Sequence, residues 1–121
     1  METPDNCCTF VPYFKINEGK LEQMKTICDK FMELTRKETK VLYYGFSFDG
    51  NVMHCREGYQ DAEGILAHIE NVGATFREAL TISDLARLEV HGPEKELEKL
   101  RGPLAELKPQ FFTLKYGFRR S

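Results

Sequence analysis

The stretch CREGYQDAEGILAHIENV, residues 55–72, contains the residue best suited to acid–base chemistry, His68. An imidazole has an ordinary pKa of about 6.5, so it exchanges protons near neutral pH. His68 lies three residues after Ile65 and four before Val72, so it borders the apolar stripe of an expected helix. It is therefore a candidate catalytic base. The alternative is that His68 hydrogen-bonds a backbone carbonyl and only closes the core.

Two further polar residues, His54 and Arg56, fall on the mixed face of a β-hairpin expected over residues 41–59. Facing a pocket, they would bind an oxyanion. Facing a second copy of the chain, they would pair with Glu89 or Arg87. The residue types alone leave both alternatives open.

Aromatic and sulfur-containing side chains are the third group of interest, because Trp is absent and nine Phe and five Tyr must build the core. A flat aromatic ligand would suit the set Phe10, Phe14, Tyr44, Phe46, Phe48 and Met53. The same side chains are also expected core filling between sheet and helices. If a cavity exists among them, the candidate substrate-binding residues are Tyr44, Phe46, Met53, His54, Arg56 and Phe76.

The cysteines and histidines do not follow a metal-binding pattern. The four cysteines include no C-x-x-C pair, and His54, Cys55, His68 and His91 have no recognised ligand spacing. We expect no metal, no cofactor and mostly free, buried thiols, with a reactive thiol at Cys7 or Cys8 as the alternative. Phosphate-binding loops and G-x-S-x-G elbows are absent from the sequence.

Length and charge restrict the partners and the location. The chain has 121 residues, a net charge of −2 and interspersed acids and bases, which predicts one domain and no nucleic-acid partner. No apolar run is long enough to span a membrane, and the N-terminus lacks a signal-peptide pattern. We therefore expect a cytoplasmic protein with no membrane contact, with a flexible leader over residues 1–7 and a single domain over 8–121.

Periodicity predicts the elements that must position these residues. Alternation predicts strands over 8–16, 41–48, 51–59, 82–92 and 111–118. Helical spacing predicts a helix of about 18 residues that starts at Asn17 and ends among Arg36, Lys37 and Lys40, and further helices over 61–80 and 93–101. Asn17 and Asp61 are the expected N-caps. Asp49-Gly50 is the expected hairpin turn, which would place Phe46 opposite Met53.

The order of these elements predicts the fold. The first six follow β-α-β-β-α-β, the ferredoxin-like α+β arrangement of an antiparallel sheet with two helices on one face. A short C-terminal helix and an extra strand follow. The other sheet face would stay uncovered, so we expect a homodimer in which two sheets face each other.

The pattern Y-x-D-A-E-G-x-x-A-H over residues 59–68, which follows a strand ending in CREGY, resembles the antibiotic biosynthesis monooxygenase-like (ABM) domains. The later EVHGP and FFTLKYGFRR are similar to the ends of uncharacterised members. The resemblance implies a dimeric α/β barrel and carries over His68 at its helix position. Its haem-degrading branch relies on a tryptophan with a histidine and an asparagine, and this chain has no Trp.

The resemblance implies a small cofactor-independent monooxygenase that acts on a phenolic or quinol-type molecule. In such an enzyme the substrate anion itself reduces O₂, so the protein needs mainly a base and a dry pocket. The competing hypothesis is a non-catalytic dimer that binds a small molecule, such as an aromatic ligand, or that serves as a regulatory or stress-response protein. A closed apolar cavity with two or more polar groups, His68 among them, would favour the enzyme.

Overall fold

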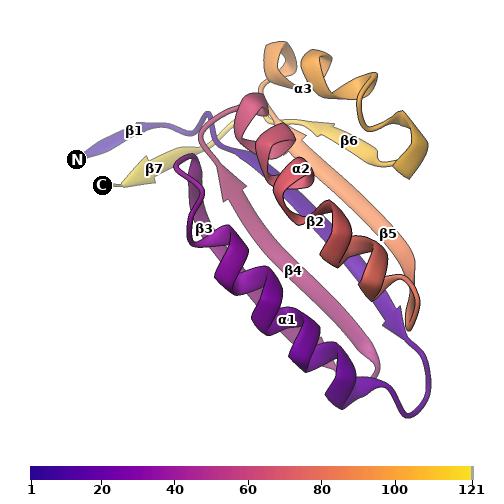
Figure 1. The fold of residues 1–121 in the computed structure, drawn as a ribbon. Helices are drawn as coiled ribbons and strands as arrows, with labels where there is room; N and C mark the ends of the chain where they lie inside the picture. Colours follow the sequence, from indigo (N-terminus) through magenta and orange to yellow (C-terminus); the bar gives the residue numbers. More distant parts are fainter. Residues whose placement is uncertain (121) are drawn as a thin grey trace.

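The computed structural model describes residues 1–120, so Ser121, the last residue of the predicted domain, lies outside the described residues. Its elements are, in chain order (Figure 1), β1 (Glu2–Pro4), β2 (Cys8–Ile16), α1 (Leu21–Thr35), β3 (Val41–Asp49), β4 (Val52–Tyr59), α2 (Ala62–Ala79), β5 (Ser83–Gly92), α3 (Glu94–Arg101), the 3₁₀ turn η1 (Ala105–Leu107), β6 (Gln110–Thr113) and β7 (Phe118–Arg120). No helix among the described residues is both long and apolar enough to cross a membrane.

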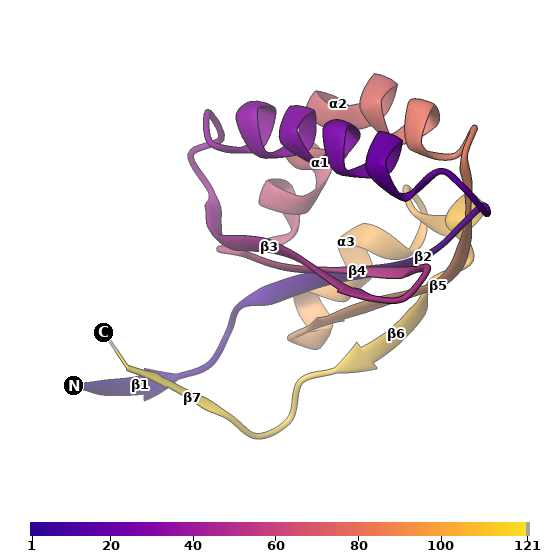
Figure 2. The same cartoon turned by 90° about the horizontal axis from the view of Figure 1, so that it is seen from below.

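One five-stranded sheet with the order β3-β4-β2-β5-β6 forms the centre of the molecule. Helices α1 and α2 cover the same face of it (Figure 2). The pairs among β2, β3, β4 and β5 are antiparallel, whereas β6 joins the edge of β5 in parallel and makes the sheet mixed. The predicted ferredoxin-like α+β fold, with its short C-terminal helix and extra strand, is confirmed.

The two chain ends form a separate antiparallel ribbon in which Glu2 is opposite Arg120. This ribbon extends away from the sheet on the side opposite α1 and α2 (Figure 2). Strand β1 lies within the predicted leader, and the strand expected over 111–118 is replaced by the shorter β6 and β7. Because β6 covers the edge of β5, the C-terminal segment protects a row of backbone hydrogen-bonding groups.

The core consists of two apolar clusters between the sheet and the helices. One joins the ends of β2 and β5 to α2 and α3, with Phe10, Ile65, Val90 and Leu97 among its buried members. The other packs α1 and the second half of α2 against Phe14 and neighbouring strand residues. The candidate site lies where these clusters meet.

The β3–β4 hairpin differs from the prediction in register. The two-residue loop is Gly50-Asn51, and Gly50 adopts a φ of +59°, which favours glycine. Phe46 therefore lies opposite Cys55 and not opposite Met53. Because the shift is two residues, every side chain keeps its predicted face.

Helix α1 begins at Leu21, four residues later than predicted. The chain first makes a turn in which the Lys20 backbone N–H donates to the Asn17 carbonyl at 3.1 Å, and Gly19 has a φ of +79°. Asn17 is therefore not the N-cap of this helix. The prediction for α2 is confirmed: the Asp61 carboxylate caps it by accepting from the Gly64 N–H at 3.0 Å.

The sheet face that no helix covers carries both aromatic and charged residues. The Arg56 guanidinium lies 5.6 Å from the centre of the Tyr43 ring, and the Arg87 side chain pairs with Glu89 at 2.5 Å. Tyr43 and Val52 are about 40% exposed. The hairpin face predicted to be mixed is thus the open one. It is less apolar than the uncovered face from which a homodimer was expected.

Candidate functional site

Strand β4 brings a carboxyl group into the protein interior. Its alternation turns Met53, Cys55, Glu57 and Tyr59 toward the helices, and all four side chains are buried. The Glu57 side chain is only 2% exposed. No lysine or arginine among residues 1–120 pairs with it, so no fixed positive charge offsets the cost of ionising this carboxyl.

His68, on helix α2, lies between two carboxyl groups. Its Nδ1 is 2.9 Å from Glu38 Oε2 and its Nε2 is 3.2 Å from Glu57 Oε1. The His68 side chain is 3% exposed, and its partners are side chains, not the backbone carbonyl considered as an alternative. A chain of carboxyl, imidazole and carboxyl therefore connects the loop before β3, helix α2 and strand β4.

Two neighbouring side chains hold the ends of this chain in place. The Asn71 amide donates to Glu38 Oε2 at 2.8 Å and to the Leu34 carbonyl at 3.0 Å. The Tyr59 hydroxyl donates to Glu57 Oε1 at 2.6 Å. With Glu38 accepting at Nδ1, the geometry favours the tautomer in which Nδ1 carries the proton and Nε2 faces Glu57 as an acceptor.

Burial shifts the pKa values of the two central groups in opposite directions. It raises the pKa of Glu57 to about 8, although hydrogen bonds from Tyr59 and Cys55 partly offset it. Burial lowers the pKa of His68, and this effect outweighs the negative charge of Glu38 and its hydrogen bond. Near pH 7 both groups are neutral, so Glu57 holds a proton beside an unprotonated imidazole nitrogen.

Two weaker acids surround this pair. Burial, followed by the charge of Glu57, raises the pKa values of Tyr44 and Cys55 above their ordinary range, so both stay protonated. The Tyr44 ring meets the His68 ring edge-on, with centroids 5.2 Å apart. They can act as hydrogen-bond donors or as walls, but not as bases.

The acid–base pair faces a cavity of about 430 Å³. Glu57, His68, Tyr44 and Cys55 contribute polar groups to its wall, as do Arg77 and Glu106, whereas Glu38 and Tyr59 are not part of the wall. Most of the remaining wall is apolar and includes Phe10, Phe14, Phe31, Phe46 and Phe76. A mostly apolar cavity with a few converging polar groups is the usual form of a small-molecule site.

The predicted site residues fall into two places. Those that line the cavity are His68, Tyr44, Phe46 and Phe76, whereas Met53 lies in the core outside its wall. His54 and Arg56 lie on the open face, where His54 packs against Tyr13 with ring centroids 4.9 Å apart. The binding role assigned to each of these residues stays a prediction.

Sequence reasoning missed Glu57, Glu38 and Tyr59. A signal existed for Glu57, because the alternation that turns Cys55 inward also turns inward the residue two positions later. No periodicity marks Glu38, which lies in the connection after α1. Its role depends on a residue 30 positions away in the sequence.

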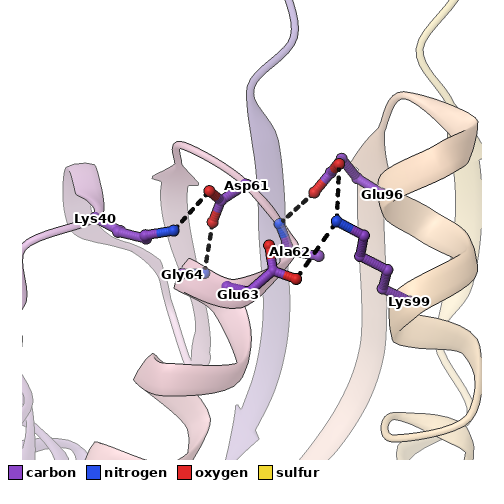
Figure 3. Close-up of polar contacts among 7 residues, drawn as sticks. All are labelled: Lys40, Asp61, Ala62, Glu63, Gly64, Glu96 and Lys99. Carbon is purple, nitrogen blue, oxygen red and sulfur yellow. Dashed lines mark hydrogen bonds and ion pairs between the residues drawn. The ribbon is translucent and has the colours of Figure 1, made fainter.

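A set of polar contacts fixes the start of α2 and therefore the position of His68 (Figure 3). Lys40 pairs with the capping Asp61 at 2.7 Å, and Glu96 of α3 accepts from the Ala62 N–H at 2.9 Å. Lys99 lies 3.5 Å from Glu63 and 3.4 Å from Glu96. Helix α3 is thus bound to the first turn of α2, less than two turns before His68.

The histidines and cysteines do not converge on a metal site. Within residues 1–120, no group of three His, Cys, Asp or Glu side chains is arranged to hold a metal ion. Cys55 and His68 line the cavity, whereas His91 pairs with Glu89 at 3.1 Å on the open face. The four thiols are free and buried, which includes Cys7 and Cys8.

Solved structures identify the relatives of this arrangement. MupZ from Pseudomonas fluorescens is 51% identical in sequence and superimposes with a TM-score of 0.92, over 98% of this chain and 93% of that chain. The chain belongs to the MupZ family. A scan of protein-family models finds no match, and a search of curated proteins finds no significant one.

More distant structures share the fold of this MupZ-family chain. An antibiotic biosynthesis monooxygenase is 15% identical with a TM-score of 0.60, over 69% of this chain and 92% of that one. SnoaB, a cofactor-independent oxygenase from Streptomyces nogalater, is 10% identical with a TM-score of 0.63, over 71% of this chain and 91% of its own. The resemblance to ABM-like domains is confirmed at the level of fold.

The segment after Gly92 follows the β-α-β-β-α-β unit of residues 8–92 and forms part of the site. It supplies Pro103, Leu104, Glu106 and Leu107 to the cavity wall.

Proposed function

We propose that this chain is a general acid–base enzyme that transforms a small, largely apolar molecule in the cavity beside Glu57 and His68. The observation that carries this proposal is the 3.2 Å contact between a carboxyl and an imidazole that are both neutral near pH 7 and both face the same cavity. Paired groups with pKa values shifted by their surroundings are typical of acid–base sites. A binding protein has no need of this pair, so the geometry favours the enzyme over the non-catalytic dimer.

Each group has a defined part in the reaction. His68, oriented through Nδ1 by Glu38, accepts a proton from an attacking hydroxyl group or water at Nε2. Glu57 donates its proton to an oxygen atom of the substrate whose bond to carbon breaks. One proton is taken up and one is released, so the protein returns to its starting state once a proton passes from His68 back to Glu57. Glu38, Asn71 and Tyr59 are positioning residues.

A second candidate reaction is the cofactor-independent monooxygenation of a phenolic or quinol-type molecule. Here His68 removes the phenolic proton, and the resulting anion reduces O₂. The aromatic cavity wall and the fold shared with SnoaB favour this candidate. It needs mainly a base, whereas the neutral carboxyl of Glu57 has its most direct use in protonating a leaving oxygen. We therefore place the redox-neutral reaction first.

Isotope labelling separates the two reactions. The purified protein would be incubated with apolar esters and epoxides, and with hydroquinones and anthrones, in the presence of a chelator and without flavin. Products would be analysed by mass spectrometry after parallel reactions in H₂¹⁸O and under ¹⁸O₂. Label from water supports the redox-neutral reaction, and label from O₂ together with oxygen uptake supports monooxygenation.

Variants test the assigned groups. For either reaction, His68→Gln should lower kcat by about 10² or more, and Glu57→Gln should do so for the redox-neutral reaction. The matched controls are His54→Gln, on the open face, and Glu70→Gln, on the exposed side of α2. Turnover that survives in both His68→Gln and Glu57→Gln would overturn the proposal, as would a complete lack of turnover across the panel.

We also propose that the protein works as a homodimer through the open sheet face. Tyr43 and Val52 are partly exposed there, and Arg56, Arg87 and Glu89 offer opposite charges to a second copy. Sedimentation equilibrium would measure the mass. A monomer at micromolar concentration would contradict the dimer without affecting the acid–base assignment, because every group of that site belongs to one chain.

A further inference from the structure

Helix α2 carries a positive charge, Arg77, at the end of its cavity-lining stretch opposite to His68. Its cavity-facing residues recur at helical spacing from His68 through Val72 and Gly73 to Phe76 and Arg77. Arg77 is nine residues after His68. Among the described residues that line the cavity, it is the sole lysine or arginine.

The Arg77 side chain bends back along the helix over Gly73. Its Nη1 lies 3.6 Å from the position that a Cβ atom on Gly73 would take, so the guanidinium occupies the space beside a residue without a side chain. Neither an ion pair nor a side-chain hydrogen bond of Arg77 is found among residues 1–120. By contrast, Lys30 in the facing helix α1 pairs with Glu78, the next residue along α2. Arg77 is exposed, so its guanidinium lies in solvent at the cavity wall with no protein partner for its donors in the described part of the chain.

The segment after Gly92 also contributes to the cavity wall. It supplies one acid, Glu106, which is exposed and does not lie within ion-pairing distance of Arg77. Along helix α2 the cavity wall thus runs from His68 of the acid–base pair to the guanidinium of Arg77, and phenylalanines form much of the remaining wall. An apolar substrate alone would use the acid–base pair and the phenylalanines and leave the guanidinium to solvent.

We propose that the substrate of this site is an amphipathic anion whose carboxylate binds Arg77 while its reacting oxygen lies beside Glu57 and His68. This inference rests on the proposed function, because it assigns the substrate class of the same cavity. A guanidinium binds a carboxylate through two parallel hydrogen bonds, which fixes orientation as well as charge. The anchor would hold the substrate so that the same carbon–oxygen bond always meets the acid.

The helix sets the length of this substrate. At about 1.5 Å per residue, Gly73 is roughly 7 Å and Arg77 roughly 14 Å from His68 along the helix axis. Because the guanidinium bends back between these two levels, its carboxylate partner and the reacting oxygen are separated by a distance in that range. A medium-length acyl chain or a small fused ring system spans it.

Binding of two probes that differ only in charge tests the anchor. Octanoate and octan-1-ol would be titrated separately into the full-length protein at pH 7 and followed by calorimetry and by the ¹⁵N–¹H signal of the Arg77 side chain. Octanoate should bind at least about tenfold more tightly than octanol, and it should shift the Arg77 signal. Added salt should reduce this preference.

The variants separate an anchor from a merely structural arginine. In Arg77→Gln, the affinities for octanoate and octanol should lie within about twofold of each other. Lys95→Gln removes an exposed charge outside the cavity and should keep the tenfold preference for octanoate. Arg77→Lys should keep part of it, and Glu106→Gln should increase it by removing a nearby negative charge. If Arg77 only stabilised the end of α2, its loss would lower the stability slightly and leave the preference unchanged.

Equal binding of octanoate and octanol by the wild type would overturn the proposal, as would a preference that persists in Arg77→Gln or weak millimolar binding of both probes. Because binding requires no turnover, Glu57→Gln should keep the octanoate preference even though it loses activity. A failed anchor with an inactive Glu57→Gln variant leaves the acid–base function standing. A working anchor without turnover would overturn that function and leave an anion-binding site.

Discussion

Glu57 and Glu89 lie on opposite faces of the same sheet, and their surroundings give the two carboxyls opposite pKa shifts. Burial between sheet and helices raises the pKa of Glu57 to about 8. Burial alone would also raise the pKa of Glu89, but hydrogen bonds from Arg87 and His91 on the open face outweigh it and lower that pKa. Two differences separate the cases: Glu57 is buried more deeply, with 2% of its side chain exposed against 16% for Glu89, and only Glu89 has a cationic partner.

With Glu57 on one face and Glu89 on the other, one sheet supports both chemistry and stability. On the helix-covered face, the carboxyl keeps its proton at neutral pH and can donate it, at a cost in stability. On the open face, the carboxylate is already ionised and its proton is not available, but it stabilises the sheet through its pairs with Arg87 and His91. Strand alternation assigns each glutamate to its face, and the neighbouring side chains decide what it does there.

The largest expected effect is on the pH dependence of stability in Glu57→Gln. In the wild type, the unfolded carboxyl ionises above its ordinary pKa of 4.5 while the folded one keeps its proton to about 8. The native state therefore binds more protons in this window, and the free energy of unfolding falls by up to about 1.4 kcal/mol per pH unit. Glu57→Gln removes this slope, so the variant should equal the wild type near pH 4 and exceed it at pH 8.

Urea unfolding at pH 4, 5, 6, 7 and 8 would measure this difference. Glu70→Gln, an exposed glutamate of α2, is the matched control and should follow the wild-type curve. Parallel curves for Glu57→Gln and the wild type would mean that Glu57 ionises normally in the folded protein. The contrast between the two sheet faces would then be lost.

A smaller effect is expected for Tyr59→Phe, which removes the hydroxyl that donates to Glu57 at 2.6 Å and keeps the ring beside His68. Loss of one buried hydrogen bond should cost about 1 kcal/mol of stability. Because this bond lowers the pKa of Glu57, its loss should raise that pKa further. An infrared titration of the Glu57 carboxyl would measure this pKa shift, and Tyr13→Phe on the open face is the control. If the pKa of Glu57 does not change in Tyr59→Phe, Tyr59 is not a positioning residue.

The fold could be predicted from the sequence because each element carries its own local pattern. The buried residues of α2, Ile65, Val72 and Ala79, recur at helical spacing, and Asp61 is an N-cap by residue type and by structure. The errors lie at boundaries set by backbone conformation. Gly19 and Gly50 both take positive φ, and this property displaced the start of α1 and the hairpin turn by a few residues.

The candidate site was harder to predict because its contacts are between distant residues. His68 could be selected by type and helix position, yet its partners Glu38 and Glu57 come from two other elements. Charged residues are expected on surfaces, so a glutamate in an apolar alternation was not taken as a buried acid. The additional cavity wall after Gly92 depends on how α3 docks against α2, which no local pattern contains.

The smallest expected effect is that of Glu89→Gln, and its sign should oppose that of Glu57→Gln. Because the folded pKa of Glu89 is lowered, its contribution to stability is present above the unfolded pKa of 4.5 and is lost as the pH falls through the folded value. The variant should therefore be less stable than the wild type at pH 7, by less than about 1 kcal/mol because solvent screens this partly exposed pair, and the difference should shrink as the pH falls below 4.5.

The effect of Glu89→Gln on stability should depend on protein concentration if the open face forms the contact between two copies. If a second copy covers the open face, the pair between Glu89 and Arg87 loses solvent when the dimer forms, and removing one partner costs more in the dimer than in the monomer. The loss at pH 7 should then grow as the protein is concentrated through the dimerisation range, whereas the gain in Glu57→Gln should stay constant. A Glu89→Gln effect that does not vary with concentration would place this carboxylate outside any contact between copies. A stabilising effect would remove the distinction between the two faces.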